Sequence, residues 1–209
     1  MRNKRNRLQV AVSGITFCFF GFGLANLAQA AIPLNEYDAV ILAARDGQTA
    51  GAIAQLQAWH REYPQNQKVL HDLVVVLGWG GDFNGALAYA DELSVAGTPA
   101  YVLKSLGQSA RSAERWAQAE QIYRMVLRSS PADMEARTGL VHALLGQKQP
   151  DAALQYVQSF LPAFGSAYKR SDAPMVTLLG FVYMRRDEPL YAAQAYQDAL
   201  RLDPQSREA

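Results

Sequence analysis

Residues 116–131 read WAQAEQIYRMVLRSSP, and residues 189–204 read PLYAAQAYQDALRLDP. When the two segments are aligned on their closing prolines, each has an alanine four residues before a tyrosine. Each also has two apolar residues, three and four positions after that tyrosine. Spacings of three and four residues gather side chains on one face of an α-helix, and proline is common just beyond a helix end. The two segments therefore predict the same amphipathic helix at two places in the chain.

Another helix is expected ahead of each segment, and it carries Leu106-Gly107 in one copy and Leu179-Gly180 in the other. Glycine inside a helix costs about 1 kcal/mol relative to alanine, so it indicates close approach by a neighbouring helix. The combined pattern resembles the tetratricopeptide repeat. That repeat is a helical hairpin of about 34 residues with leucine-glycine, tyrosine, alanine and proline at fixed offsets.

The same register, extended along the chain, predicts five repeats. They are expected at residues 33–66, 67–99, 100–133, 134–167 and 173–206. An ordinary helical hairpin is the alternative for the first two repeats taken alone. A longer connection, residues 161–171, separates the fourth repeat from the fifth. Five copies in phase predict an all-α tetratricopeptide-repeat superhelical solenoid over residues 31–209.

The first 30 residues have the pattern of a secretory signal peptide. Four basic residues lie within the first seven positions, an apolar stretch follows, and Ala28 and Ala30 supply the small residues that a signal peptidase requires. A retained membrane anchor is the alternative, although the apolar stretch has only about 15 residues and a membrane span needs about 20. We expect cleavage after Ala30 and an exported, periplasmic protein, with or without association to the outer membrane.

Cleavage would leave 16 Lys and Arg against 19 Asp and Glu, a formal net charge of −3 for residues 31–209. A general nucleic-acid binder is basic, so this class is excluded. The only cysteine, Cys18, lies in the expected signal peptide. The mature chain would then have neither a disulfide nor a thiolate ligand or nucleophile.

Solenoids of this kind expose the first helix of each repeat along a groove, where ligands bind. On a helical wheel, thirteen residues lie on the side of these helices away from the packing positions. These candidate groove residues are Tyr37, Arg45, His71, Trp79, Tyr101, Lys104, Gln108, Arg111, Glu135, Thr138, His142, Phe181 and Arg185. Aromatic faces mixed with polar groups suit an extended peptide or a sugar polymer. For each residue the alternative is an ordinary solvated or packing side chain.

Motifs of catalysis are absent from the sequence. The histidines His60, His71 and His142 fall in three different repeats, and no metalloprotease, serine-hydrolase, phosphate-loop or dinucleotide signature occurs. The glycine-rich segment at residues 78–81 joins two expected helices, which favours a turn over a phosphate cradle. We therefore expect a non-enzymatic protein with no cofactor and no metal.

Two short stretches resemble a particular family. Residues 35–47 read NEYDAVILAARDG and residues 77–82 read LGWGGD. Both are similar to the periplasmic tetratricopeptide domain of the outer-membrane exporters of poly-β-1,6-N-acetylglucosamine, and the resemblance covers residues 31–209. The Tyr-Asp-Ala opening and the Trp-x-Gly turn are its more specific parts.

In that family the repeats precede an outer-membrane β-barrel, guide the polysaccharide and contact the periplasmic deacetylase that modifies it. The resemblance therefore implies the polymer, the deacetylase or other proteins as partners. This chain departs from the family because no barrel-length alternating strands follow the repeats before Ala209. We expect the barrel to be encoded downstream in a longer protein. A truncated reading frame and an end covered by a partner are the alternatives.

Two functions remain open at this point. The first is a periplasmic scaffold that assists export of poly-β-1,6-N-acetylglucosamine by binding the polymer, its modifying enzyme, or both. The second is a general periplasmic protein–protein adaptor for secretion, pilus or cellulose-export machinery. An enzyme is a distant third.

Overall fold

The computed structural model describes residues 32–94, 97–162 and 167–205, all in one compact unit. The expected signal peptide, residues 1–30, lies outside the described residues. Every regular element in the described part of the chain is helical, which confirms the predicted fold class. The α-helices are α1 (Leu34–Arg45), α2 (Thr49–Glu62), α3 (Gln67–Trp79), α4 (Phe83–Ala88), α5 (Ala100–Ser112), α6 (Trp116–Ser129), α7 (Met134–Gly146), α8 (Pro150–Gln158), α9 (Ala173–Arg185) and α10 (Pro189–Leu202). Two short 3₁₀ turns, η1 (Ala90–Glu92) and η2 (Arg170–Asp172), complete the described elements.

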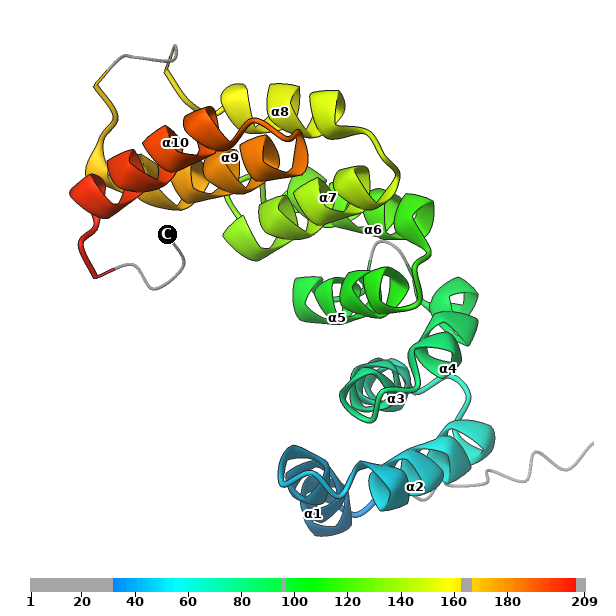
Figure 1. Ribbon diagram of the computed structural model, residues 1–209. Coiled ribbons are helices and arrows are strands. Elements are labelled where there is room, and N and C mark those ends of the chain that lie inside the picture. Colours follow the sequence, from blue (N-terminus) through cyan, green and yellow to red (C-terminus); the bar gives the residue numbers. More distant parts are fainter. Residues whose placement is uncertain (1–31, 95–96, 163–166, 206–209) are drawn as a thin grey trace, which may run out of the picture. The chain divides into compact units, whose positions relative to one another are not determined.

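The α-helices pair into five hairpins with the same turn (Figure 1). Three residues separate the two helices of every hairpin, and the middle residue has a left-handed backbone with φ between 56° and 89°. These middle residues are Gly47, Gly81, Glu114, Lys148 and Asp187. Glycine adopts this conformation without strain, whereas other residues pay about 1 kcal/mol for it. The recurrence of one turn geometry at five places shows that the hairpins are copies of one unit.

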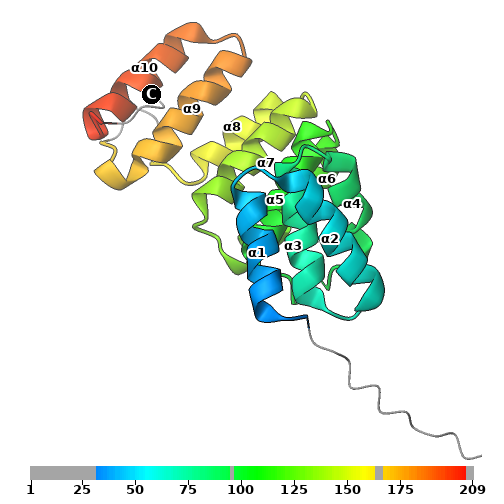
Figure 2. The ribbon, with the colours of Figure 1, turned by 90° about the horizontal axis from the view of Figure 1, so that it is seen from below.

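Successive hairpins pack side by side in chain order. The second helix of each hairpin contacts the first helix of the next, as α6 contacts α7. The first helices also contact one another in sequence, from α3 through α5 and α7 to α9 (Figures 1 and 2). These first helices therefore form a continuous face, which we call the first-helix face.

Small residues allow the helices to approach closely. Ala119 and Ala192, which precede the two repeat tyrosines, have no exposed surface. The ring of Tyr123 lies so close to Gly107 that a Cβ there would be 2.8 Å from the ring, and Tyr196 has the same relation to Gly180. The mid-helix glycines therefore make room for the tyrosine rings of the partner helices.

Three helices differ from the expected pattern. The turn after α3 is shorter than the sequence indicated, because Gly78 and Trp79 belong to the helix. A Cβ on Gly78 would lie 3.1 Å from the Ser109 hydroxyl oxygen, so this glycine serves helix packing against α5. In addition, α4 has only six residues and α8 only nine, whereas α2, α6 and α10 have fourteen each.

Candidate functional site

One pocket on the first-helix face draws its lining from three successive hairpins. Its volume is about 330 Å³. Four candidate groove residues that are far apart in sequence meet here: Arg111 of α5, His142 of α7, and Phe181 and Arg185 of α9. The full lining consists of Arg111, Ser112, Trp116, His142, Leu145, Gly146, Phe181 and Arg185. We call this site the cationic pocket.

Helix packing brings these side chains together. The pocket lies at the last turns of α5, α7 and α9, because each of these helices contributes residues from its C-terminal end. Gly146 ends α7, and a Cβ there would lie 2.2 Å from the indole of Trp116. The glycine therefore lets the indole reach the end of α7 and become part of the wall. Basic residues near a helix C-terminus also complement the partial negative charge of the helix dipole.

His142 is a neutral member of the cationic pocket at neutral pH. Its ring contacts the Phe181 ring, with the two centroids 4.8 Å apart. Burial is the main reason that the pKa of His142 falls to about 4, and the positive charges of Arg111 and Arg185 lower it further. The imidazole thus acts as a flat, mostly apolar surface beside two guanidinium groups.

The charge of the pocket favours an anionic or neutral ligand. Two guanidinium groups contribute to its lining, and none of the lining residues is Asp or Glu. The Nε–H of Arg111 is buried and has no hydrogen-bond partner. A buried donor left unpaired costs about 1–3 kcal/mol, and because this nitrogen has almost no accessible surface, a ligand would reach it only after the side chain moved.

Lys104 and Glu135 do not line the cationic pocket, and they are paired with each other. The Lys104 ammonium lies 2.6 Å from the Glu135 carboxylate and 3.1 Å from that of Asp133. These contacts raise the pKa of Lys104, with the hydrogen bond to Glu135 as the largest cause. Asp133 also caps α7 by accepting a 2.9 Å hydrogen bond from the Ala136 amide. This cluster joins α5 to the start of α7 and is structural.

The structure corrects the prediction for two candidate groove residues, because Tyr37 and His71 are both buried. Tyr37 is 5% exposed: its ring stacks on Trp59 at 5.4 Å, and its hydroxyl donates a hydrogen bond to Asp72. His71 is 9% exposed, and its desolvation lowers its pKa. The wheel projection placed them on the open side, but Trp59 of α2 stacks on the ring of Tyr37, and His71 is buried.

The remaining candidates lie on the first helices outside the cationic pocket. Trp79 and Tyr101 are 51% and 53% exposed. They lie at opposite ends of their helices, because Trp79 ends α3 and Tyr101 is the second residue of α5. Arg45 and Gln108 are exposed and Thr138 is half-buried. None of these five residues lines the pocket.

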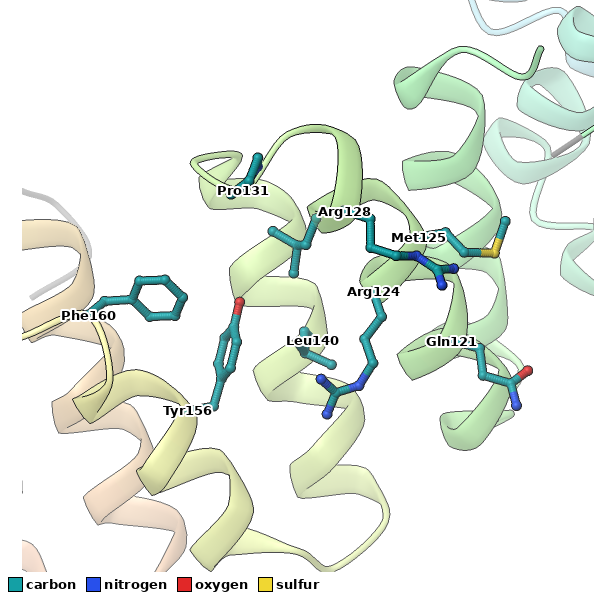
Figure 3. A pocket seen from close by; sticks show the side chains of 9 residues that line it. Gln121, Arg124, Met125, Arg128, Pro131, Leu140, Tyr156 and Phe160 are labelled. Atoms are coloured by element: carbon teal, nitrogen blue, oxygen red, sulfur yellow. The ribbon is translucent and has the colours of Figure 1, made fainter. Parts of the chain in front are cut away.

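A larger pocket lies between second helices and was missed by the sequence analysis. It has a volume of about 660 Å³ and is shown in Figure 3. Its lining consists of Gln121, Arg124, Met125, Leu127, Arg128, Pro131, Leu140, Tyr156 and Phe160. The helical wheels covered only first helices, so this site was outside their reach. The available signal was two pairs of residues spaced by four: Arg124 with Arg128, and Tyr156 with Phe160.

Neither a cluster of metal ligands nor a membrane-spanning helix occurs in the described part of the chain. There, no group of three or more His, Cys, Asp or Glu side chains could hold a metal ion. Among the same residues, none of the helices combines the length and the apolar character that crossing a membrane requires.

Comparison with known proteins identifies the repeat. A sequence model of the tetratricopeptide repeat family matches residues 110–170. The structure of MamA (residues 41 to the end) from Desulfovibrio magneticus RS-1 superposes with a TM-score of 0.66 at 19% identity, covering 83% of this chain and 96% of that one. The fold is a tetratricopeptide-repeat solenoid. YrrB, described as a tetratricopeptide repeat protein with an unusual peptide-binding site, superposes on this solenoid with a TM-score of 0.62 at 16% identity, covering 87% and 91% of the two chains.

Part of the chain is similar in sequence to one segment of a larger curated protein. Cellulose synthase operon protein C of Pseudomonas fluorescens (strain SBW25) is 32% identical over 123 residues, which make up 57% of this chain and 10% of that protein. The chain therefore spans about a tenth of the length of the curated relative that it matches. The matched family is defined by its structural repeat and not by a catalytic activity.

Proposed function

We propose that this chain is a non-catalytic docking scaffold of a polysaccharide-export system, and that its cationic pocket binds an acidic segment of a partner protein. The observation that carries the proposal is the convergence of Arg111, His142 and Arg185 from three hairpins on one pocket. A site assembled from several repeats is how a solenoid presents an extended binding surface. The similarity to cellulose synthase operon protein C supports the polysaccharide context.

The charge of the pocket supports a protein partner over a deacetylated polymer. Deacetylation of a poly-N-acetylglucosamine chain exposes amines, which are cationic at neutral pH. Arg111 and Arg185 would repel them, and no acidic side chain of the lining would attract them. A carboxylate, by contrast, can accept two parallel hydrogen bonds from one guanidinium group. Docking of the modifying enzyme or of another export component is therefore the favoured form of the scaffold function.

A neutral polymer is the second candidate ligand, and two exposed aromatic residues favour it. Trp79 and Tyr101 present about half of their surfaces to solvent on the first-helix face. Aromatic rings pack on the apolar faces of sugars. Binding of a neutral polymer would then use these rings and leave the cationic pocket for a protein.

The proposal places the scaffold in the periplasm. Its support is the signal-peptide pattern in residues 1–30, with four basic residues, an apolar stretch and small residues before Ala31. The loss of Cys18 with that segment would leave a chain that an oxidising compartment cannot crosslink.

The test is a titration of the purified chain with three classes of ligand. The ligands are 20-residue peptides tiled across the proteins encoded beside it, oligomers of poly-β-1,6-N-acetylglucosamine with and without deacetylation, and cello-oligosaccharides. Tryptophan fluorescence reports on binding, because Trp116 lines the cationic pocket and Trp79 is exposed, whereas Trp59 is only 7% exposed.

The expected result is saturable binding of an acidic peptide that is weakened by at least about tenfold in Arg111→Ala and Arg185→Ala. The matched control is Arg45→Ala, an exposed arginine in the last turn of α1 outside the pocket, which should bind like the parent. If only the sugars bind, and the two pocket variants bind them like the parent, the neutral polymer is the favoured ligand. Equal loss of binding in all three variants would show that the cationic pocket is not the binding site.

A further inference from the structure

One side of α10 is exposed and carries apolar side chains. The main contacts of α10 in the described part of the chain are with α9 and η2, and Figure 2 shows α9 between α10 and α8. Leu190 and Leu200 of α10 are 86% and 40% exposed. An edge helix that nothing covers has a polar outer side in soluble repeat arrays. The exposed leucines therefore indicate a surface that another helix covers.

The same side of α6 is covered by α7. Both α6 and α10 have fourteen residues, and the tyrosine of each comes nine residues after the left-handed turn residue of its hairpin. Four positions on one side of α6, spaced by four, three and four residues, therefore correspond to four positions of α10. They are Trp116, Glu120, Tyr123 and Leu127 in α6, and Pro189, Ala193, Tyr196 and Leu200 in α10. We call the four residues of α10 the α10 face.

Contacts with α7 bury the four positions of α6. The Tyr123 ring lies against Gly139, and Glu120 accepts a 2.7 Å hydrogen bond from Gln147. Each of the four residues of α6 is more buried than its counterpart in α10. Tyr123, for example, is 2% exposed, whereas Tyr196 is only half-buried. The α10 face is therefore the same interaction surface without its partner helix.

The tyrosine of the α10 face determines which helix can cover it. The Tyr123 ring lies against two glycines, Gly107 in its own hairpin and Gly139 in the next one. The Tyr196 ring lies against Gly180 in its own hairpin. A Cβ at Gly139 would overlap the Tyr123 ring, so a helix that packs on Tyr196 in the same way needs glycine at that position.

The first two hairpins have a different pair of residues at these positions. Leu56 of α2 comes nine residues after Gly47, which is the tyrosine position. Asp72 of α3 comes nine residues before Gly81, which is the position of Gly139 in α7. A smaller side chain in the second helix thus accompanies a larger residue in the helix that covers it. Tyrosine in the α10 face accordingly predicts glycine in the covering helix.

A second copy of this chain does not supply such a helix. In the described part of the chain, α1 is the first helix that no preceding hairpin covers. Asp38 lies in α1 nine residues before Gly47, at the position of Gly139 in α7. Packing of α1 on the α10 face would bring Asp38 against the Tyr196 ring, which is unfavourable for both packing and desolvation. The covering helix therefore comes from a different protein.

We propose that the α10 face binds the first helix of a tetratricopeptide hairpin in a partner protein, with a glycine against the Tyr196 ring and apolar residues beside Leu200. The basis is continuity with an interface that the chain already contains, between α6 and α7. The partner hairpin would extend the solenoid by one repeat. The α10 face shares no residue with the cationic pocket, so this inference goes beyond the proposed function and does not depend on it.

The test combines the whole chain with a stapled helical peptide that represents the partner helix. The peptide has the sequence of residues 133–149, which includes Gly139, and a hydrocarbon staple joins positions 137 and 141 on the opposite side of the helix. A matched peptide carries Gly139→Leu. Fluorescence anisotropy of the labelled peptides measures affinity. Methyl NMR of the leucine-labelled chain locates the site, with Leu200 as the reporter and Leu42 of α1, which is 59% exposed, as the internal control.

The expected result is saturable binding of the glycine peptide that shifts the Leu200 methyl signals and leaves those of Leu42 unchanged. The Gly139→Leu peptide should bind at least about tenfold more weakly, because its leucine would overlap the Tyr196 ring. Leu200→Glu in the chain should weaken binding by a similar factor, since the interface would bury its charge. Leu42→Glu, the same change in another exposed leucine, should bind like the parent. The thermal melting of Leu200→Glu should stay unchanged, because the side chain is exposed.

Four results would overturn the proposal. Absence of binding by either peptide would show that the α10 face does not recognise a repeat helix. Equal affinity of the two peptides would show that no contact forms between the ring and a glycine. Equal loss of binding in Leu200→Glu and Leu42→Glu would show that the peptide has no preference for α10. Shifts of both leucine signals as the chain alone is concentrated would show that a second copy covers the face.

Discussion

The ring of Tyr123 in α6 lies against Gly139 in α7 so closely that a Cβ on the glycine would be 2.3 Å from the ring carbon Cζ. Real Cβ atoms do not approach other atoms to this distance, so α6 and α7 are held at a spacing that only glycine allows. Through this contact, one hairpin fixes the position of the next. The cationic pocket depends on it, because His142 lies one turn beyond Gly139 on α7.

Gly139→Ala should therefore destabilise the protein. The added methyl group must push the Tyr123 ring or separate the helices, and such overpacking costs about 1–3 kcal/mol. Urea unfolding followed by circular dichroism measures the change. Gly51→Ala is the matched control, since a Cβ at Gly51 in α2 would meet nothing within 4 Å. This second variant should be more stable by about 0.5–1 kcal/mol through helix propensity alone, and a Gly139→Ala variant that behaves the same way would contradict the packing.

The left-handed turn residues give a second prediction. Lys148 is exposed with φ at 59°, so glycine at this position should remove the strain and stabilise the protein by about 0.5–1 kcal/mol. Gly47 has φ at 89°, and Gly47→Ala should cost about 1 kcal/mol. Differential scanning calorimetry of both variants shows whether each substitution stabilises or destabilises the protein. Stabilisation by Gly47→Ala, or destabilisation by Lys148→Gly, would mean that the hairpin turns have another geometry.

The lowered pKa of His142 predicts acid sensitivity. In the unfolded chain the imidazole takes up a proton near its ordinary pKa of about 6.5, whereas in the folded protein it stays neutral down to about pH 4. Between these values the unfolded state binds more protons, so the free energy of unfolding falls as the pH drops from 6.5 toward 4. A fall of the pKa from about 6.5 to about 4 corresponds to about 3 kcal/mol. Because the ring is only half-buried, solvent screening reduces the expected loss from this residue to about 2 kcal/mol.

Urea unfolding of the parent and of His142→Asn at pH 7.0, 5.5 and 4.5 measures this effect. His71, whose pKa is also lowered, is present in both proteins and contributes equally. The variant should therefore lose less stability on acidification than the parent. Parallel pH profiles for the two proteins would show that His142 is as solvated in the folded state as in the unfolded one.

An anionic ligand should reverse the preference of His142 for the neutral form. A carboxylate bound beside Arg111 and Arg185 would favour the protonated imidazole and raise its pKa. By linkage, the acidic peptide should bind more tightly as the pH falls from 7 to 5.5, with proton uptake on binding. Calorimetric titrations in buffers of different ionisation enthalpy measure that uptake. Weaker binding at pH 5.5 would show that the ligand carboxylate is far from His142.

The sequence was sufficient to predict the helical hairpins, because the alanine, tyrosine and glycine positions encode contacts within one repeat. The helical wheel also placed Arg111, His142, Phe181 and Arg185 on one side of the first helices, where they line one pocket. That these residues bind a ligand stays a prediction. Other features depend on contacts between repeats, which a helical wheel does not represent. Trp59 from α2 covers Tyr37, and Asp133, just ahead of α7, pairs with Lys104 of α5.

The larger pocket escaped prediction for a different reason. Its lining comes from α6, from Leu140 of α7, and from α8 with the turn after it. The helical wheels covered only first helices, so they did not represent the side chains of α6 and α8 that line this space.

The central claim is that the cationic pocket docks a partner required for polysaccharide export. Its most direct test is secretion by the source organism after chromosomal replacement with Arg111→Ala/Arg185→Ala, measured as exported polymer per cell at an equal level of the scaffold protein. We predict that this double variant exports as little polymer as a deletion strain, whereas Arg45→Ala exports as much as the parent. Export at the parental level from a stable Arg111→Ala/Arg185→Ala protein would contradict the account.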